Sequence, residues 1–212
     1  QHNFLYLTED RGDGCFYRFV PIGLDAMGRP DLTSGTLEVA EVDAMSGQVN
    51  WVEIPDPSAA SQDTRYQIQS STEFNGGEGI VYYDGFVYFA TKGDDRIWSY
   101  DTVSRHINVI YDATTHPNPI LTGVDNITLA QNGELIVSED GGDLQIVAMT
   151  QDVQLIPVLQ LSGHNHSEVT GPAFSPDGQR LYFSSQRGST GYSADGVTFE
   201  VTGPFSQLLA NA

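Results

Sequence analysis

The 212-residue sequence predicts an all-β fold of the β-propeller class, and three observations lead to that prediction. Short apolar runs rich in β-branched and aromatic residues follow the turn dipeptides Asp84-Gly85, Asn132-Gly133 and Asp177-Gly178. Such dipeptides favour tight hairpins, because the central residues of those turns need positive φ. The turn glycines recur 48 residues apart (85 to 133) and then 45 apart (133 to 178), with no helical periodicity between them. A strand-only repeat of this length is typical of propeller blades of roughly four strands.

About four quasi-repeats are recognisable, at 1–55, 76–115, 124–160 and 168–205. The second is the clearest meander, with strands expected near 76–82, 86–91, 96–101 and 107–111. The first lacks one strand, and we expect its innermost strand to lie before residue 1. The fourth departs from the pattern after Arg187. Residues 56–69 show no period and predict a surface loop or a short helix between blades. Four blades are few for a closed ring, so we expect a larger propeller, completed by a missing N-terminal segment or a partner chain.

Composition narrows the classes of function. The formal charge is −19, from 28 acidic and 9 basic residues, which disfavours nucleic-acid binding. Two interpretations remain: an acidic solvating surface, or carboxylates gathered to hold hard cations. No apolar stretch is long enough for a transmembrane segment. Cys15 is the sole cysteine and is expected to be a buried thiol in a strand. The chain has no initiator Met and no signal peptide, so we expect a processed product or a fragment.

Acidic residues recur at one place in each repeat. In a propeller the first strand of a blade lines the central channel and the second is its antiparallel neighbour, so the start of one meets the end of the other at one rim. Glu78, Asp125-Asn126 and Glu168 stand at the starts of first strands. The second strands end in Glu9-Asp10, Thr91-Lys92, Glu139-Asp140 and Gln186-Arg187. The acids are therefore predicted to converge around one mouth of the channel.

Carboxylates gathered in one cavity raise each other's pKa unless water screens them or hard cations bind among them. An oxygen-only ligand set favours Ca²⁺ or Mg²⁺. The alternative is that Asp or Asn beside Gly only makes a turn, which explains Asp84, Asn132 and Asp177 well. It explains Glu78 and Glu139 less well, since Glu has no preference for tight turns.

Two arginines follow the rim positions, Arg11 and Arg187. A guanidinium at a metal-lined mouth would bind a phosphate or carboxylate through two hydrogen bonds. The alternative is an ion pair with Glu9 or Asp10. The spacing of His164 and His166 suits a metal, but no third His lies nearby, so a solvated loop is favoured over a zinc site. No nucleophile elbow, phosphate-binding loop or zincin helix is present.

Five segments that together span nearly the whole chain form an ordered set: residues 7–19, Gly77-Glu78-Gly79-Ile80, Asp125-Asn126-Ile127, residues 138–142 and residues 167–178. In sequence and in order, this set resembles the PhoX-type alkaline phosphatases. Members of that family are secreted β-propellers that hydrolyse phosphomonoesters with calcium and iron at the channel mouth. The resemblance implies a periplasmic or extracellular protein that acts on a small-molecule phosphate ester.

The resemblance also implies roles for individual residues. Glu78 and Glu139 would be metal ligands, and Asp125, Asn126 and Glu168 would be calcium ligands or their supporting partners. Glu9 and Asp10 carry over more weakly as ligands. Arg187 or Arg11 would contact the phosphate during metal-assisted attack on phosphorus, with Ca²⁺ and Fe³⁺ as the implied cofactors.

The family carries further ligands N-terminal to this chain, including a cysteine and a His-Glu pair, and Cys15 stands in a different motif. The chain is thus expected to be the C-terminal portion of a larger propeller or a shortened relative. A non-catalytic, calcium-stabilised extracellular module and a different propeller hydrolase, such as a lactonase, are the alternative functions.

Overall fold

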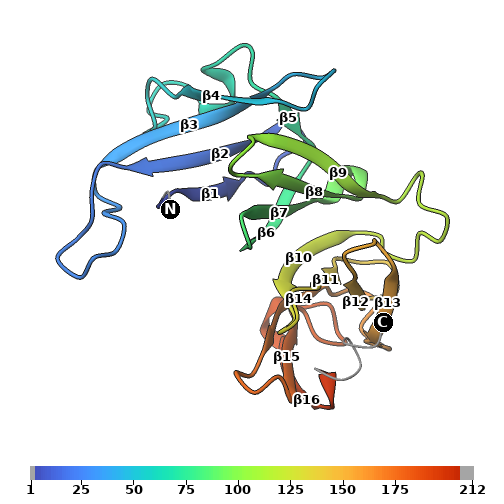
Figure 1. The fold of residues 1–212 in the computed structure, drawn as a ribbon. Coiled ribbons are helices and arrows are strands. Elements are labelled where there is room, and N and C mark those ends of the chain that lie inside the picture. The colour runs from blue at the N-terminus through green and yellow to red at the C-terminus, as the bar shows by residue number, and fades with distance from the viewer. Residues whose placement is uncertain (1–2, 206–212) are drawn as a thin grey trace.

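A computed structural model describes residues 3–205, which fold into four antiparallel sheets that follow one another in chain order (Figure 1). The first sheet contains β1 (Leu5–Thr8), β2 (Gly14–Pro21), β3 (Gly35–Val42) and β4 (Val49–Glu53), and the short β5 (Glu73–Phe74) pairs with β2. The second contains β6 (Gly77–Tyr83), β7 (Phe86–Thr91), β8 (Arg96–Asp101) and β9 (His106–Asp112).

The third sheet contains β10 (Val124–Leu129), β11 (Leu135–Glu139), β12 (Gln145–Met149) and β13 (Leu155–Gln160). The fourth contains β14 (Val169–Phe174), β15 (Arg180–Ser185) and β16 (Val197–Thr202). Three short 3₁₀ turns complete the described elements: η1 (Thr64–Tyr66), η2 (Lys92–Asp94) and η3 (Ser193–Asp195). The all-β prediction is confirmed, and residues 56–69 form a loop that contains η1.

Hairpin turns start the second strand of three sheets where the glycine dipeptides predict them. Asp84 and Gly85 have φ values of 45° and 90°, and Gly133 and Gly178 have φ values of 90° and 65°. These left-handed conformations suit Gly and are tolerated by Asp. The turn chemistry therefore sets where each of these strands begins.

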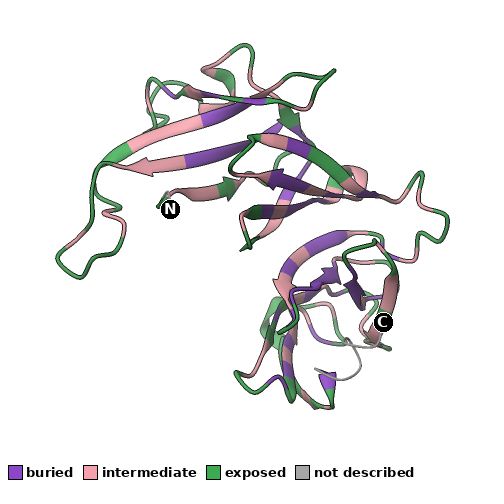
Figure 2. Ribbon diagram, viewed as in Figure 1, coloured by how far each residue is buried: buried purple, intermediate pink, exposed green. Residues whose placement is uncertain are grey.

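The core lies between neighbouring sheets, because successive side chains of a strand point to opposite faces. On β11, Val137 packs with Val124 and Ile97 toward the second sheet. The next residue back, Ile136, packs with Leu181 and its neighbours toward the fourth sheet. All five residues of β11 are buried, and this strand and β12 are the buried centre of the third sheet (Figure 2).

The junction between the first two sheets is aromatic. Phe16 stacks on Phe89 with ring centroids 4.6 Å apart, and the indole N–H of Trp51 donates a 2.9 Å hydrogen bond to the hydroxyl of Tyr100. All four rings thus bury a large apolar area, and the polar atoms of Trp51 and Tyr100 are hydrogen-bonded to each other.

The strand pairing defines equivalent positions in different sheets. Thr91, Glu139 and Ser185 pair with the first residues of β6, β10 and β14. A register shift follows directly after that pair in β6, between Gly77 and Ile80, and in β10, between Val124 and Ile127. In β14 it comes one residue later, between Thr170 and Ala173. Such bulges reorient side chains locally, and here they carry Glu78 and Asp125.

Candidate metal centre

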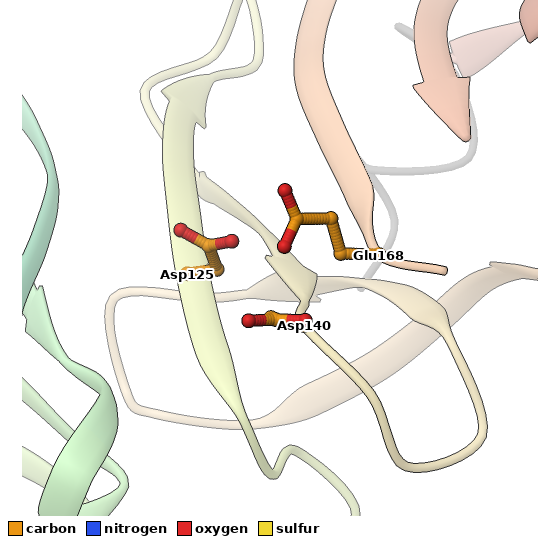
Figure 3. A group of neighbouring side chains, drawn as sticks. All are labelled: Asp125, Asp140 and Glu168. Atoms are coloured by element: carbon orange, nitrogen blue, oxygen red, sulfur yellow. The ribbon is translucent and has the colours of Figure 1, made fainter. Parts of the chain in front are cut away.

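Three carboxylates meet at the boundary between the third and fourth sheets. Asp125 lies on β10, Asp140 directly follows β11, and Glu168 directly precedes β14. One oxygen from each lies within 4.8 Å of the others (Figure 3). An isolated β-bridge joins Asp140 to Glu168, so main-chain pairing holds these two residues together. We call these three residues the acid triad.

Two cationic side chains flank the acid triad. Lys92 Nζ lies 2.6 Å from Glu78 Oε1 and 3.0 Å from Asp140 Oδ2. Arg187 Nη2 lies 3.4 Å from Glu168 Oε2 and 3.7 Å from Asp140 Oδ1. Four formal negative charges therefore face two positive ones, and the cluster keeps an excess of negative charge.

The pKa shifts reflect this crowding. Burial, the hydrogen bond with Glu78 and the charge of Glu78 raise the pKa of Asp125 to about 7. Burial and the nearby Asp140 also raise the pKa of Glu168. For Lys92, burial acts to lower the pKa, but the hydrogen bonds to Glu78 and Asp140 outweigh it and the pKa is raised. The amine is thus held in its charged form.

The donor set fits a hard cation. The acid triad offers only carboxylate oxygens, and Ca²⁺ and Mg²⁺ prefer such ligands. Asp125 is 5 % exposed, so its charge is poorly solvated and a bound cation would relieve that cost. Glu78 lies beside Asp125 and extends the oxygen set toward the second sheet.

Asn126 supports the acid triad from one side. Its Nδ2 donates a 2.9 Å hydrogen bond to Asp125 Oδ1. Its Oδ1 accepts hydrogen bonds from Thr170 Oγ1 at 2.9 Å and from the Gly171 N–H at 2.6 Å. The amide therefore orients Asp125 and also joins β10 to β14.

Glu139 and Glu9, both predicted as ligands, lie outside the acid triad and bind backbone. The Glu139 carboxylate is fully buried and accepts hydrogen bonds from the Thr122 N–H at 2.9 Å and the Gln145 N–H at 2.8 Å. Burial raises its pKa to about 7. In the first sheet Glu9 accepts a similar bond from the Cys15 N–H at 3.2 Å.

Glu9 has two further partners, which differ from those of Glu139. Its carboxylate accepts hydrogen bonds from the Tyr17 hydroxyl at 2.8 Å and from Arg65 Nη1 at 2.7 Å. Glu9 and Glu139 thus both anchor the turn that leads into the following strand, and that anchoring needs no metal.

Asp10 and Arg11 are exposed in the turn after β1. Within residues 3–205 neither side chain has a hydrogen bond or an ion pair, although the Arg11 carbonyl accepts from the Gly76 N–H at 2.8 Å. The two sequence-predicted arginines therefore differ: Arg187 contacts the acid triad and Arg11 does not.

Sequence reasoning did not select Asp140 and Lys92 as site residues. Asp140 is adjacent to Glu139, and because side chains alternate along a strand, only one of the two is expected to point toward the acid triad. The pattern alone does not say which. Lys92 could have been noticed because it is the only lysine in the chain and ends a second strand.

A cavity of about 760 Å³ lies away from the acid triad, against the first two sheets. Tyr6, Arg18, Tyr82 and Arg105 are among the residues that line it. Tyr82 lies at the opposite end of β6 from Glu78, so this cavity and the acid triad are separate features.

Fold and site together define a β-propeller with a candidate cation site at one end of its inner strands. The family model for alkaline phosphatase PhoX matches residues 1–110 and 99–188, and the chain belongs to this family. The comparison with curated proteins gave no match.

Among solved structures, the chain is similar to Pseudomonas fluorescens PhoX in complex with vanadate, described as a transition state analogue. The TM-score is 0.69 and the identity 18 %, over 94 % of this chain and 50 % of that one. A luciferin-regenerating enzyme matches at a TM-score of 0.48 and 18 % identity, over 95 % of this chain and 62 % of that one. The similarity to the PhoX structure shows the fold, and the chain spans about half the length of that structure.

Proposed function

We propose that this chain contributes the C-terminal portion of a metal-dependent phosphomonoesterase. The observation that carries the proposal is the acid triad with Arg187 beside it, in a chain of the PhoX family. A phosphate monoester needs cations for its negative oxygens, and this mouth offers places both for bound metal ions and for a guanidinium.

Each residue has a proposed role. Asp125, Asp140 and Glu168 hold the cation, with Glu78 as a further oxygen donor on the side of the second sheet. When bound, hard cations stabilise the negative charge that develops on the phosphoryl group and the leaving oxygen. Asn126 orients Asp125, and Arg187 turns from Glu168 toward the phosphate oxygens, where its planar donors bind two oxygens at once. Glu139, Glu9, Asp10 and Arg11 receive no direct role beyond shaping the rim.

Calcium, which the resemblance implies as a cofactor, is compatible with the acid triad because all donors are oxygens. Iron, which the resemblance also implies, would need the further ligands expected N-terminal to this chain. That segment or a partner chain would complete the ring, and a small phosphate ester would be the substrate. No helix in residues 3–205 is long and apolar enough to cross a membrane; a periplasmic or extracellular location is part of the proposal.

The test is hydrolysis of p-nitrophenyl phosphate by the full-length protein, before and after removal of metal ions and after return of Ca²⁺. Arg187→Gln should raise KM and lower kcat by a combined factor of at least about 100. Arg180→Gln, which removes an exposed arginine paired with Glu200 on the same sheet, is the matched control. Turnover that is unchanged after metal removal and by Arg187→Gln would refute the proposal.

A second candidate is a non-catalytic, calcium-stabilised extracellular module. The observation that favours it is that the acid triad joins residues of the third and fourth sheets, where a bound cation would stabilise the fold with or without catalysis. Calcium-dependent thermal stability without turnover of any phosphate ester by the full-length protein would support this alternative.

A further inference from the structure

Lys92 directly follows the second strand of its sheet, and the equivalent residues of the next two sheets have different side chains. The N–H of Lys92 donates to the Gly76 carbonyl at 2.8 Å, as the N–H of Asp140 donates to the Gly123 carbonyl at 2.8 Å. In the fourth sheet the equivalent bond runs from Gln186 to Glu168 at 3.1 Å. The same backbone position thus carries an amine, a carboxylate and an amide in three successive sheets.

The Lys92 side chain reaches from the second sheet to the third. Its ammonium group bridges Glu78 and Asp140 with contacts of 2.6 and 3.0 Å. Both partners face the mouth, and Asp140 belongs to the acid triad. A Ca²⁺ ion at about 2.3–2.6 Å from both of these oxygens would occupy the space that the ammonium group fills.

We propose that Lys92 takes the place of a divalent cation in this cluster, so that Glu78 and Asp140 are neutralised by an amine and the mouth holds fewer ions, or holds them more weakly. This inference rests on the proposed cation site, and it concerns how many ions that site accepts.

An ordinary surface ion pair is the simpler explanation of Lys92, and such pairs contribute little. Two features argue against it. The lysine is the only one in the chain, and it stands among four carboxylates, of which Asp125 is buried. Removing the amine leaves Arg187 as the one cationic side chain that contacts the acid triad within residues 3–205.

The experiment compares Lys92→Met with the unmodified protein by direct titration with CaCl₂ after metal removal. Methionine keeps most of the length of the side chain and removes its charge. We expect Lys92→Met to bind one more Ca²⁺ ion, or to bind Ca²⁺ at least about tenfold more tightly, because a repulsive charge a few ångströms away is lost. Calcium should also raise the melting temperature of the variant by more than it raises that of the unmodified protein.

Two controls isolate the effect. Lys92→Arg keeps the charge and should bind Ca²⁺ as the unmodified protein does. Arg96→Met removes a cation of the same sheet that also bridges two carboxylates, Asp94 and Asp112, but outside the acid triad. Arg96→Met should leave Ca²⁺ binding unchanged.

The outcomes separate this inference from the proposed function. If the unmodified protein binds Ca²⁺ and folded Lys92→Met binds it equally or less well, the role of Lys92 is refuted and the cation site stands. If only Lys92→Met binds Ca²⁺, the inference holds and the metal-dependent function of the unmodified chain fails. If neither binds, both are wrong.

Discussion

The second and third sheets have almost the same backbone and very different rims. Each is a four-stranded meander whose inner strand has a register shift after its first residue, and each ends its second strand with the same main-chain hydrogen bond. At that end the second sheet has Thr91 and Lys92, whereas the third has Glu139 and Asp140. The shared backbone therefore fixes where the side chains at the end of the second strand lie. Whether they offer a cation or an anion depends on the residues there, Thr91 and Lys92 in the second sheet and Glu139 and Asp140 in the third.

The two sheets also differ in how they contact the next sheet. A Cβ on Gly79 of β6 would lie 2.4 Å from the Ile127 nitrogen and 2.6 Å from the Asp125 carbonyl oxygen, so β6 approaches β10 at backbone distance. The equivalent residue of the third sheet is Asn126, which joins β14 through side-chain hydrogen bonds. The junction between β6 and β10 requires a glycine, whereas the junction between β10 and β14 is made by the polar side chain of Asn126.

The largest effect is expected from the buried anchors at the two equivalent positions. Glu139→Ala should lower the free energy of unfolding by roughly 2–5 kcal/mol, because two backbone N–H groups lose their acceptor. Thr91→Ala, which loses the hydrogen bond from the Trp98 indole at 3.0 Å, should cost only about 1–2 kcal/mol. Urea denaturation measures both. Equal losses of unfolding free energy in the two variants would contradict the expected difference between Glu139 and Thr91.

Asp140→Asn should weaken Ca²⁺ binding by more than the roughly 10–100-fold typical of residues that only support ligands. The cause is loss of one triad charge while Lys92 and Arg187 remain. Asp94→Asn in the second sheet, where Asp94 pairs with Arg96, is the control and should bind Ca²⁺ normally. Calcium titration of both variants decides whether the rim of the third sheet differs from that of the second.

Gly79→Ala should destabilise the fold by roughly 1–3 kcal/mol, because the added methyl group meets the backbone of β10. Gly23→Ala is the matched control, since a Cβ there has no neighbour within 4 Å; it should change stability by less than about 0.5 kcal/mol. Thermal denaturation compares the two. A neutral Gly79→Ala would show that the sheets separate easily at this junction.

The last prediction concerns pH. In the folded state the pKa values of Asp125 and Glu139 are about 7, whereas unfolded carboxyl groups titrate near 4. Between those values the folded protein binds more protons than the unfolded chain, so in EDTA stability should fall as pH rises from about 5 to 8. Added Ca²⁺ should reduce the fall by favouring ionised Asp125. Glu139→Gln should flatten the profile, and a rise in stability over this range would contradict the assignment.

The sequence alone predicted the all-β class, the family and the strands of the second sheet, whose ends differ from the prediction by at most one residue. These features depend on local chemistry: Gly in left-handed turns, and apolar residues alternating along short strands. It also indicated Glu78, Asp125, Glu168 and Arg187 as rim residues. In the structure Asp125 and Glu168 belong to the acid triad, Arg187 contacts it, and Glu78 shares Lys92 with Asp140.

Only the tertiary structure decided which member of the pair Glu139-Asp140 belongs to the acid triad. The two residues have the same charge and adjacent positions, so local pattern does not distinguish them. The backbone N–H groups of Thr122 and Gln145 hold Glu139 inside, while the bridge to Glu168 holds Asp140 outside. The role of Lys92 was likewise decided by contacts with residues 14 and 48 positions away along the chain, to Glu78 and Asp140. Composition fixed the excess of acid, but the packing of one sheet on the next determined which acids share a site.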